Sequence, residues 1–439
     1  MRRTIPFILA GAVIIVAGVS AFMMTRPEPQ WTTSSPAALS EFNQGLDAEM
    51  KFYQHDAAAH FRKAVELDPN FLAARLRLFM ASDMKKDEVE PLRRIISHAD
   101  LGRLTDRERF LAGMFLAATG NDRNKAEAIL DAYLKSHPHD PFALNFRCEQ
   151  HWGRQAWPAA EKCYQTLIRT DPNWVLAQNR LGYIAMAQGR FGDAERAFET
   201  YRYIAPDQSN PHDSLGELLT LLGRYDEAEK ELKEAVRIRP DFCAGWQHRI
   251  SLYLLAGRID DAEKTLDEFR QIGSCSPAVA SFDCSVAGWK EAGRGDWKGV
   301  ADVLDRGQCV GMKGDGLALR HLAAIELGDF DTAEKLEAML RKQIESMPRA
   351  GRDTYAGLEQ LVGSRLVAQH RYDEAIRTLR EADSNLSYQG DQQWLVKLYV
   401  RMRLAQALEA SGDVAGAKKL RAEIAAVNPK FEQRFQPLR

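Results

Sequence analysis

Four polar residues recur at intervals of 34 positions, and their chemistry suits peptide binding. They are Asn145, Asn179, Asp213 and Gln247. One amide or carboxylate per interval would form a polar ladder that can hydrogen-bond the main chain of an extended polypeptide without requiring a particular sequence. Bulky residues nearby in the sequence could hold apolar side chains of the same ligand: Phe142, Phe146, Trp152, Tyr183 and Met186. Aromatic anchors beside polar groups are typical of peptide-binding sites.

Motifs for other chemistries are weak. The segment SHPHD, residues 136–140, holds two histidines, but histidines on a turn are usually solvated, so no metal site is expected. The glycine-rich segment GMKGDG, residues 311–316, lacks the Lys-Ser/Thr ending of a phosphate-binding loop. No serine, histidine and acid arrangement appears in a recognisable local context. The sequence therefore predicts a protein without enzymatic activity and without a cofactor or metal.

The elements that would position the polar ladder follow from the same interval. Gly182 and Gly216 are 34 residues apart, and so are three further pairs: Gly189 and Gly223, Ala194 and Ala228, Pro206 and Pro240. Small residues allow two helices to approach closely, glycine permits a tight turn, and proline ends a helix. Each interval thus predicts a helix, a turn, a second helix and a stop.

With this pattern the chain resembles the tetratricopeptide repeat family, whose unit is a pair of antiparallel helices. The pattern covers most of residues 39–439 and becomes degenerate after residue 273. The resemblance implies an all-α fold, an α-solenoid of about 10 helical hairpins wound as a right-handed superhelix. Each hairpin has too little core to be stable alone, so it must stack on its neighbours.

The resemblance also implies a place for the polar ladder. The first helix of each repeat, helix A, lines the concave face in this family, so Asn145, Asn179, Asp213 and Gln247 would line a groove for polypeptide partners. The basic clamp by which some family members hold chaperone C-termini is not matched, because Glu149 would repel a carboxylate. An alternative is a permanent accessory subunit of a membrane enzyme or secretion apparatus, bound through the convex face. Exposed apolar residues on the second helices, helices B, would favour that alternative.

The six cysteines permit disulfides if the protein is exported. Three of them, Cys275, Cys284 and Cys309, surround a break in the repeat, where a bridge between two of them is expected. Cys148 occupies a position for a small residue between helices and is expected to be free. No CxxC pair is present, which argues against a redox enzyme and a zinc ribbon.

The N-terminus differs from the rest of the chain. Residues 5–24 carry no charge and are long enough for a transmembrane helix, while Val19-Ser20-Ala21 also resembles a signal-peptide cleavage site. Residues 1–26 are thus an expected anchor or signal peptide, and residues 27–38 an extended linker. Arg2 and Arg3 predict a cytoplasmic N-terminus, with a periplasmic or extracellular repeat domain, or a secreted one after cleavage.

Similar bacterial proteins with one anchor and a periplasmic repeat domain assist envelope complex assembly, secretion or cytochrome maturation. The resemblance implies that this chain has a role in one of these processes. The formal charge of -2 gives no reason to expect nucleic acid. The predicted partners are therefore proteins or peptides, together with the membrane through the N-terminal helix.

Overall fold

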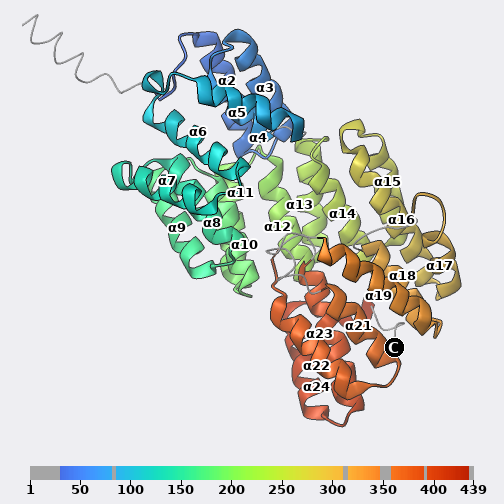
Figure 1. Ribbon diagram of the computed structural model, residues 1–439. Helices are drawn as coiled ribbons and strands as arrows, with labels where there is room; N and C mark the ends of the chain where they lie inside the picture. The colour runs from blue at the N-terminus through green and yellow to red at the C-terminus, as the bar shows by residue number, and fades with distance from the viewer. Residues whose placement is uncertain (1–29, 82–85, 310–314, 347–356, 390–392, 435–439) are drawn as a thin grey trace, which may run out of the picture. The chain divides into compact units, whose positions relative to one another are not determined.

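A computed structural model describes residues 30–81, 86–309, 315–346, 357–389 and 393–434 (Figure 1). The described residues form 23 α-helices and three short 3-10 helices, with no strands. The all-α prediction and the solenoid of helical hairpins are confirmed. The chain divides into two compact units, residues up to Ala143 and residues from Leu144.

The first unit contains three hairpins and the start of a fourth. They are α2 (Pro36–Met50) with α3 (Gln54–Leu67), α4 (Leu72–Ala81) with α5 (Lys86–His98), α6 (Asp106–Thr119) with α7 (Arg123–Ser136), and the first residues of α8 (Pro141–Gly153), most of which belongs to the second unit. A 3-10 helix, η1 (Leu101–Arg103), precedes α6. Helix α6 begins with a complete capping box, because Thr105 and Glu108 satisfy each other's backbone N–H groups.

The second unit continues with α9 (Trp157–Thr170) and then pairs each helix A with its helix B. The pairs are α10 (Leu176–Ala187) with α11 (Phe191–Ile204), α12 (Ser209–Leu221) with α13 (Tyr225–Ile238), and α14 (Cys243–Leu255) with α15 (Ile259–Arg270). They are followed by α16 (Ser276–Gly293) with α17 (Trp297–Leu304), α18 (Asp315–Glu326) with α19 (Phe330–Glu345), α21 (Gly357–Ala368) with α22 (Tyr372–Asn385), and α23 (Gln393–Ala410) with α24 (Val414–Val427). The irregular joints hold η2 (Gly273–Cys275) and η3 (Gly307–Cys309), and α25 (Phe431–Arg434) ends the described chain.

The repeated glycines have two different roles. Inside helix A, Gly216 has no side chain because Leu232 of α13 fills its place: a Cβ built there would lie 2.6 Å from Leu232 Cγ. The sequence predicts that the small Ala228 allows this close approach, and the structure shows that Leu232 of α13 also occupies the space. Between the helices, Gly223 adopts φ +72°, a left-handed conformation that favours glycine. The sequence pattern thus reports helix packing at one glycine and turn geometry at the other.

The predicted linker does not behave as an extended spacer over its described part, which begins at Gln30. Trp31 is buried and packs edge-on against Phe42 of α2, with ring centroids 4.8 Å apart. Ser35 caps α2, and Pro36 already belongs to that helix. Residues 30–38 are therefore part of the first unit rather than of a linker.

Among the described residues, no helix has both the length and the apolar character needed to cross a bilayer. The predicted anchor or signal segment, residues 1–26, lies outside the described residues. The predicted location as a single-pass membrane protein is corrected by this finding.

Candidate functional site

The structure places the central residues of the polar ladder between neighbouring helices A. Asn179 of α10 is buried and donates from Nδ2 to Asn210 Oδ1 (3.1 Å) and Ser214 Oγ (2.8 Å), both on α12. Asp213 of α12 is also buried, and its Oδ1 lies 2.8 Å from Nδ1 of His248 on α14. The ladder residues at the two ends, Asn145 and Gln247, are half-buried. Asn179 and Asp213 are therefore engaged within the scaffold.

The aromatic and apolar residues predicted beside the ladder do not form one site. Phe142 belongs to the first unit, where its ring packs on Trp31. Phe146 is half-buried and Met186 is fully buried. In the second unit, the Arg180 guanidinium lies 4.7 Å from the Trp152 ring centroid, and Tyr183 donates its hydroxyl to Glu217 Oε2 (2.8 Å). Burial, followed by the charges of Glu217 and Asp213, raises the pKa of Tyr183 well above its usual value, so the phenol remains a neutral donor.

The C-terminal repeats of the second unit cover the inner side of its central repeats. Every residue of α12 is buried. A helix with one face in solvent would have exposed residues on that face, so α12 is covered on all sides. Trp394 of α23 donates from Nε1 to Glu217 Oε1 at 3.3 Å, and Tyr388 packs edge-on against Phe191 of α11. Buried residues of α23, α24 and α25 belong to the same apolar cluster as those of α11–α17. The chain therefore fills its own groove at these repeats.

Three turns that are 34 residues apart lie next to side chains of the C-terminal repeats. Gly189 lies next to the Tyr388 ring, Gly223 next to Asn428, and Gly257 next to Arg434. Asn428 is buried, and its Nδ2 lies 3.4 Å from the hydroxyl of Tyr225. The repeat pattern identifies the turns, but no local signal in the sequence identifies what contacts them.

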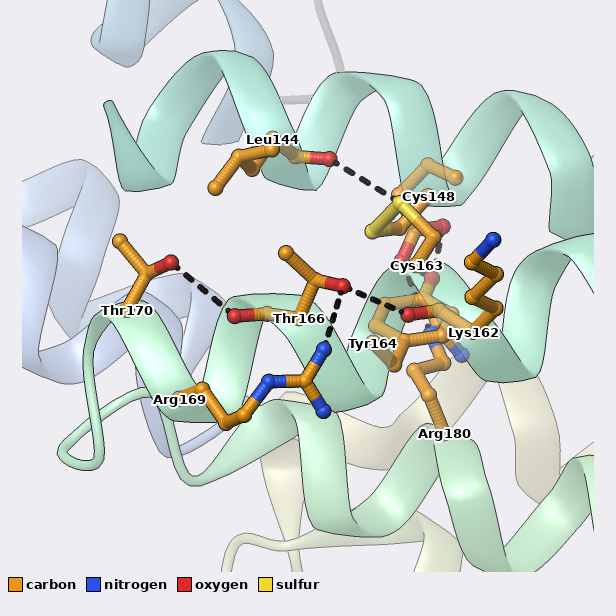
Figure 2. The surroundings of a disulfide bond; sticks show 10 residues. Leu144, Cys148, Lys162, Cys163, Tyr164, Thr166, Arg169, Thr170 and Arg180 are labelled. Carbon is orange, nitrogen blue, oxygen red and sulfur yellow. Dashed lines mark hydrogen bonds and ion pairs between the residues drawn. A yellow bond between two sulfur atoms is a disulfide. The ribbon is translucent and has the colours of Figure 1, made fainter. Parts of the chain in front are cut away.

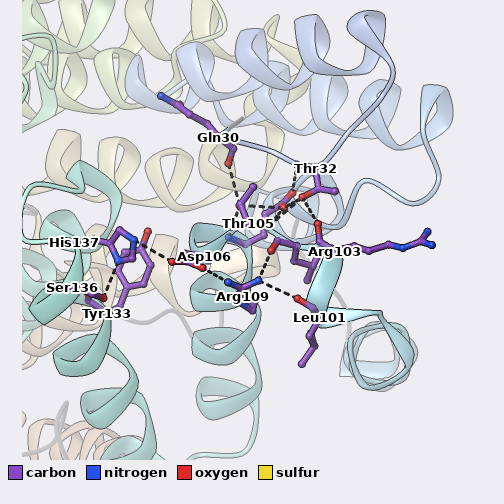
Figure 3. A network of polar contacts seen from close by, with 12 residues as sticks. Gln30, Thr32, Leu101, Arg103, Thr105, Asp106, Arg109, Tyr133, Ser136 and His137 are labelled. Atoms are coloured by element: carbon purple, nitrogen blue, oxygen red, sulfur yellow. Dashed lines mark hydrogen bonds and ion pairs between the residues drawn. The ribbon is translucent and has the colours of Figure 1, made fainter. Parts of the chain in front are cut away.

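The first unit holds a segment of its own chain that precedes α2, residues 30–33 (Figure 3). Thr32 donates its backbone N–H to Glu108 Oε1 (2.9 Å), and the Thr105 hydroxyl donates to the carbonyl oxygen of Gln30 (3.2 Å). Trp31 inserts its ring between Phe42 and Phe142, and the Arg107 guanidinium lies 5.4 Å from its ring centroid. Main-chain hydrogen bonds and one aromatic anchor are the contacts predicted for a bound peptide.

Of the two histidines of SHPHD, His137 has partners in the first unit and His139 is exposed. His137 Nε2 lies 3.3 Å from Asp106 Oδ2, as Figure 3 shows, and its ring stacks on Tyr133. Among the described residues, no group of three or more His, Cys, Asp or Glu side chains could hold a metal ion.

All six cysteines form disulfides. Cys284 is bonded to Cys309, Cys243 to Cys275, and Cys148 to Cys163. The expectation of a free Cys148 is wrong, because Cys163 of α9 faces it within the same hairpin (Figure 2). Beside this bridge, Glu149 accepts hydrogen bonds from Tyr164 (2.7 Å) and Arg180 (2.9 Å). Glu149, the residue that argued against a basic clamp, thus forms an ion pair with Arg180.

A cavity of about 130 Å³ lies in the second unit among α14, α16, α18, α21 and α23. Its wall is mostly apolar and includes Leu254, Phe282, Trp289, Leu322, Leu395 and Tyr399. Arg434 of α25 also borders it. No pattern in the sequence indicates this cavity, because its wall residues come from five hairpins and share no motif.

Comparison with known proteins supports the repeat assignment. Tetratricopeptide repeat models match residues 150–209 and residues 212–242. The chain therefore contains tetratricopeptide repeats, and their fold suggests a protein–protein interaction scaffold. Among curated proteins, no sequence matches this chain.

Similar solved structures are distant in sequence. A tetratricopeptide repeat protein from Parabacteroides merdae is 18% identical over 61% of this chain and 98% of its own, with a TM-score of 0.42. PilW, a type IV pilus biogenesis factor, is 17% identical over 45% of this chain and 93% of its own, with a TM-score of 0.38. Yeast Tom70 is 14% identical over 88% of this chain and 93% of its own, with a TM-score of 0.45.

Proposed function

We propose that this chain is a non-enzymatic tetratricopeptide repeat scaffold that binds a protein partner through the outer faces of its helices B. The burial of all residues of α12 carries the proposal, since a groove filled by the chain's own C-terminal repeats leaves no space there for an extended partner. This proposal corresponds to the accessory-subunit alternative, and not to binding of an extended polypeptide along the polar ladder. The pathway, among envelope complex assembly, secretion and cytochrome maturation, remains a prediction.

The distribution of exposed apolar side chains supports this surface. Among the described residues, six of the nine large apolar side chains that are exposed lie on helices B: Leu67, Ile95, Tyr203, Ile204, Met339 and Val414. Tyr203 is 87% exposed and is followed directly by the exposed Ile204 at the end of α11. Adjacent apolar residues on a surface are a common feature of protein interfaces.

An oxidising compartment is part of the proposal. All six cysteines are paired in three disulfides. Disulfides form and persist in oxidising compartments. Mass spectrometry of the unreduced protein, isolated with thiols blocked, should find no alkylated cysteine. Alkylation of all six would contradict an oxidising location.

Photocrosslinking from single positions tests the binding surface. A benzophenone side chain placed at Tyr203 or Met339 should give covalent adducts with a partner in native extracts. The same group at Gln247 or Tyr183, on helices A, should give none. Adducts from the helix A positions alone would contradict the proposal and would favour a binding site at the polar ladder.

A second candidate function is capture of an extended segment by the first unit, which the docked residues 30–33 favour. A peptide with the sequence QWTTSS should bind a Trp31→Ala variant, whose own anchor is missing, more tightly than it binds the wild type. Equal binding to both proteins would remove this candidate.

A further inference from the structure

The cavity of the second unit has the size and lining of a ligand site. Its volume of about 130 Å³ suits a group of the size of a phenyl ring, and apolar protein cavities of this scale bind such groups. Phe282 and Trp289 of α16 contribute aromatic walls, while Leu254, Leu322 and Leu395 contribute aliphatic ones. An apolar group of this size would therefore contact aromatic and aliphatic side chains inside the cavity.

Two polar side chains of the wall, His321 and Ser364, have hydrogen-bond partners in neighbouring residues. His321 Nε2 lies 3.0 Å from Glu337 Oε1, and Glu337 also binds the guanidinium of Arg365 at 2.8 and 2.9 Å. Ser364 donates its hydroxyl to the carbonyl oxygen of Gln360 at 2.8 Å. Because they are hydrogen-bonded, His321 and Ser364 can line an apolar cavity without the cost of a buried, unpaired polar group.

Arg434 supplies a charge at the edge of the cavity. Its Nε donates to the carbonyl oxygen of Leu254 at 3.0 Å, and its guanidinium lies 5.0 Å from the centroid of the Trp289 ring. Within the part of the chain that the structure describes, Arg434 forms no ion pair. Burial lowers its pKa from the usual value, although a guanidinium stays protonated in proteins. A half-buried cation without a carboxylate is costly, and an anionic group beside it would offset that cost.

The surface next to Arg434 carries charges of both signs. Lys430 and Arg434 border a second hollow of about 550 Å³ together with Asp226 and Arg258. Arg258 already binds Glu229 and Asp261, whereas Lys430 contacts the ring of Tyr225 at 4.9 Å. The cavity therefore has an apolar interior, with the guanidinium of Arg434 at its edge.

We propose that this cavity and Arg434 bind a ligand that carries a phenyl-sized apolar group next to a carboxylate. The apolar group fills the cavity, and the carboxylate pairs with the guanidinium. Two sources have this chemistry, a free arylalkyl carboxylic acid and the last residue of a peptide with an apolar side chain. The inference is independent of the proposed function, which concerns the outer faces of helices B.

Calorimetric titration of the full-length chain tests the proposal. The probes are 3-phenylpropanoate and its neutral amide, 3-phenylpropanamide, which differ in charge and hardly in shape. The acid should bind at least about tenfold more tightly than the amide, because a charge-assisted hydrogen bond is lost with the amide. Equal affinity, or no binding of either probe, would overturn the proposal. A tripeptide Gly-Ala-Phe, with a free or an amidated C-terminus, then distinguishes the two sources.

Variants assign the contacts. Arg434→Met should weaken binding of the acid by about tenfold and leave binding of the amide unchanged. The matched control is Arg306→Met, which removes a guanidinium whose side chain is 75% exposed and is not part of the cavity lining. Ala318→Phe adds a ring to the cavity wall and should abolish binding of both probes. Unchanged affinity in Arg434→Met contradicts the proposal, even if Ala318→Phe fails to fold.

The chain's own end provides one more outcome. Residues 435–439 include two bulky apolar residues, Phe435 and Leu438, and a double-alanine variant tests them as competitors of the probe. If the acid binds only after Phe435→Ala and Leu438→Ala are introduced together, the cavity belongs to the chain's own end, and the proposal is overturned.

Discussion

Trp394 donates its indole N–H to Glu217 Oε1 at 3.3 Å, and this contact joins helices that are 177 positions apart in the sequence. Both side chains are buried, and Glu217 also accepts the hydroxyl of Tyr183 at 2.8 Å. The contact connects the last repeat to the polar groups between α10 and α12. Tyr183, which the sequence places at a ligand groove, therefore shares its acceptor with a residue of the last repeat.

Removing this donor should weaken the closure of the second unit. Trp394→Phe keeps an aromatic ring but leaves Glu217 with one donor fewer, which should lower the free energy of unfolding by about 1–3 kcal/mol. Urea denaturation measures the change. Tyr203→Phe, at an exposed position, is the control and should change stability by less than about 0.5 kcal/mol. Equal stability of the two variants would show that the contact contributes nothing.

Two turn glycines with the same backbone conformation should respond differently to alanine. Gly223 and Gly295 both have φ +72°, so either substitution should cost about 1–2 kcal/mol of left-handed strain. A Cβ at Gly223 would also lie 2.5 Å from Asn428 Oδ1, whereas at Gly295 it meets no atom within 4 Å. Gly223→Ala should therefore destabilise more, and limited proteolysis should cut near α24 sooner. Identical losses would place Asn428 away from this turn.

The bridge at the first irregular joint should stabilise the second unit. Cys243 and Cys275 close a segment across α14, α15 and η2, with a sequence separation of 32. Replacing both by serine should lower the free energy of unfolding by about 3–4 kcal/mol through the added freedom of the unfolded chain. Thermal unfolding of this variant should match that of the wild type more closely once dithiothreitol has reduced both proteins. A difference that reduction leaves unchanged would instead reflect packing.

Stability should fall in acid partly through Glu229. Burial alone would raise the pKa of this carboxyl, but hydrogen bonds from Arg258, Lys233 and Tyr253 outweigh burial and lower the pKa to about 2. Because the folded-state pKa lies below the unfolded value, ionised Glu229 stabilises the fold above about pH 5, and this contribution is lost as the pH falls toward about 2. Glu229→Gln should therefore be less stable than the wild type at neutral pH, with the difference shrinking in acid. Denaturation curves across this range, with the exposed Glu199→Gln as control, measure it.

The repeat pattern was sufficient to predict the fold. Glycine inside helix A, glycine in the turn and proline after helix B each act on residues close by in the sequence, so Gly216, Gly223 and Pro240 specify a hairpin locally. The need of each hairpin for a neighbour then implies a solenoid. The same local reasoning missed the Cys148–Cys163 bridge, because a small apolar cysteine and a bonded one occupy similar positions between two helices.

The sequence by itself determined that this chain is a series of helical hairpins with polar residues recurring on helix A. Only the tertiary structure decided that Asn179 and Asp213 are buried, that the C-terminal repeats cover α12, and that Arg434 meets an apolar cavity. The physical reason is distance along the chain. The repeat period in the sequence reflects contacts between adjacent repeats. The pairing of Trp394 with Glu217 depends instead on the sum of the small rotations between many successive hairpins, and no single residue determines that sum.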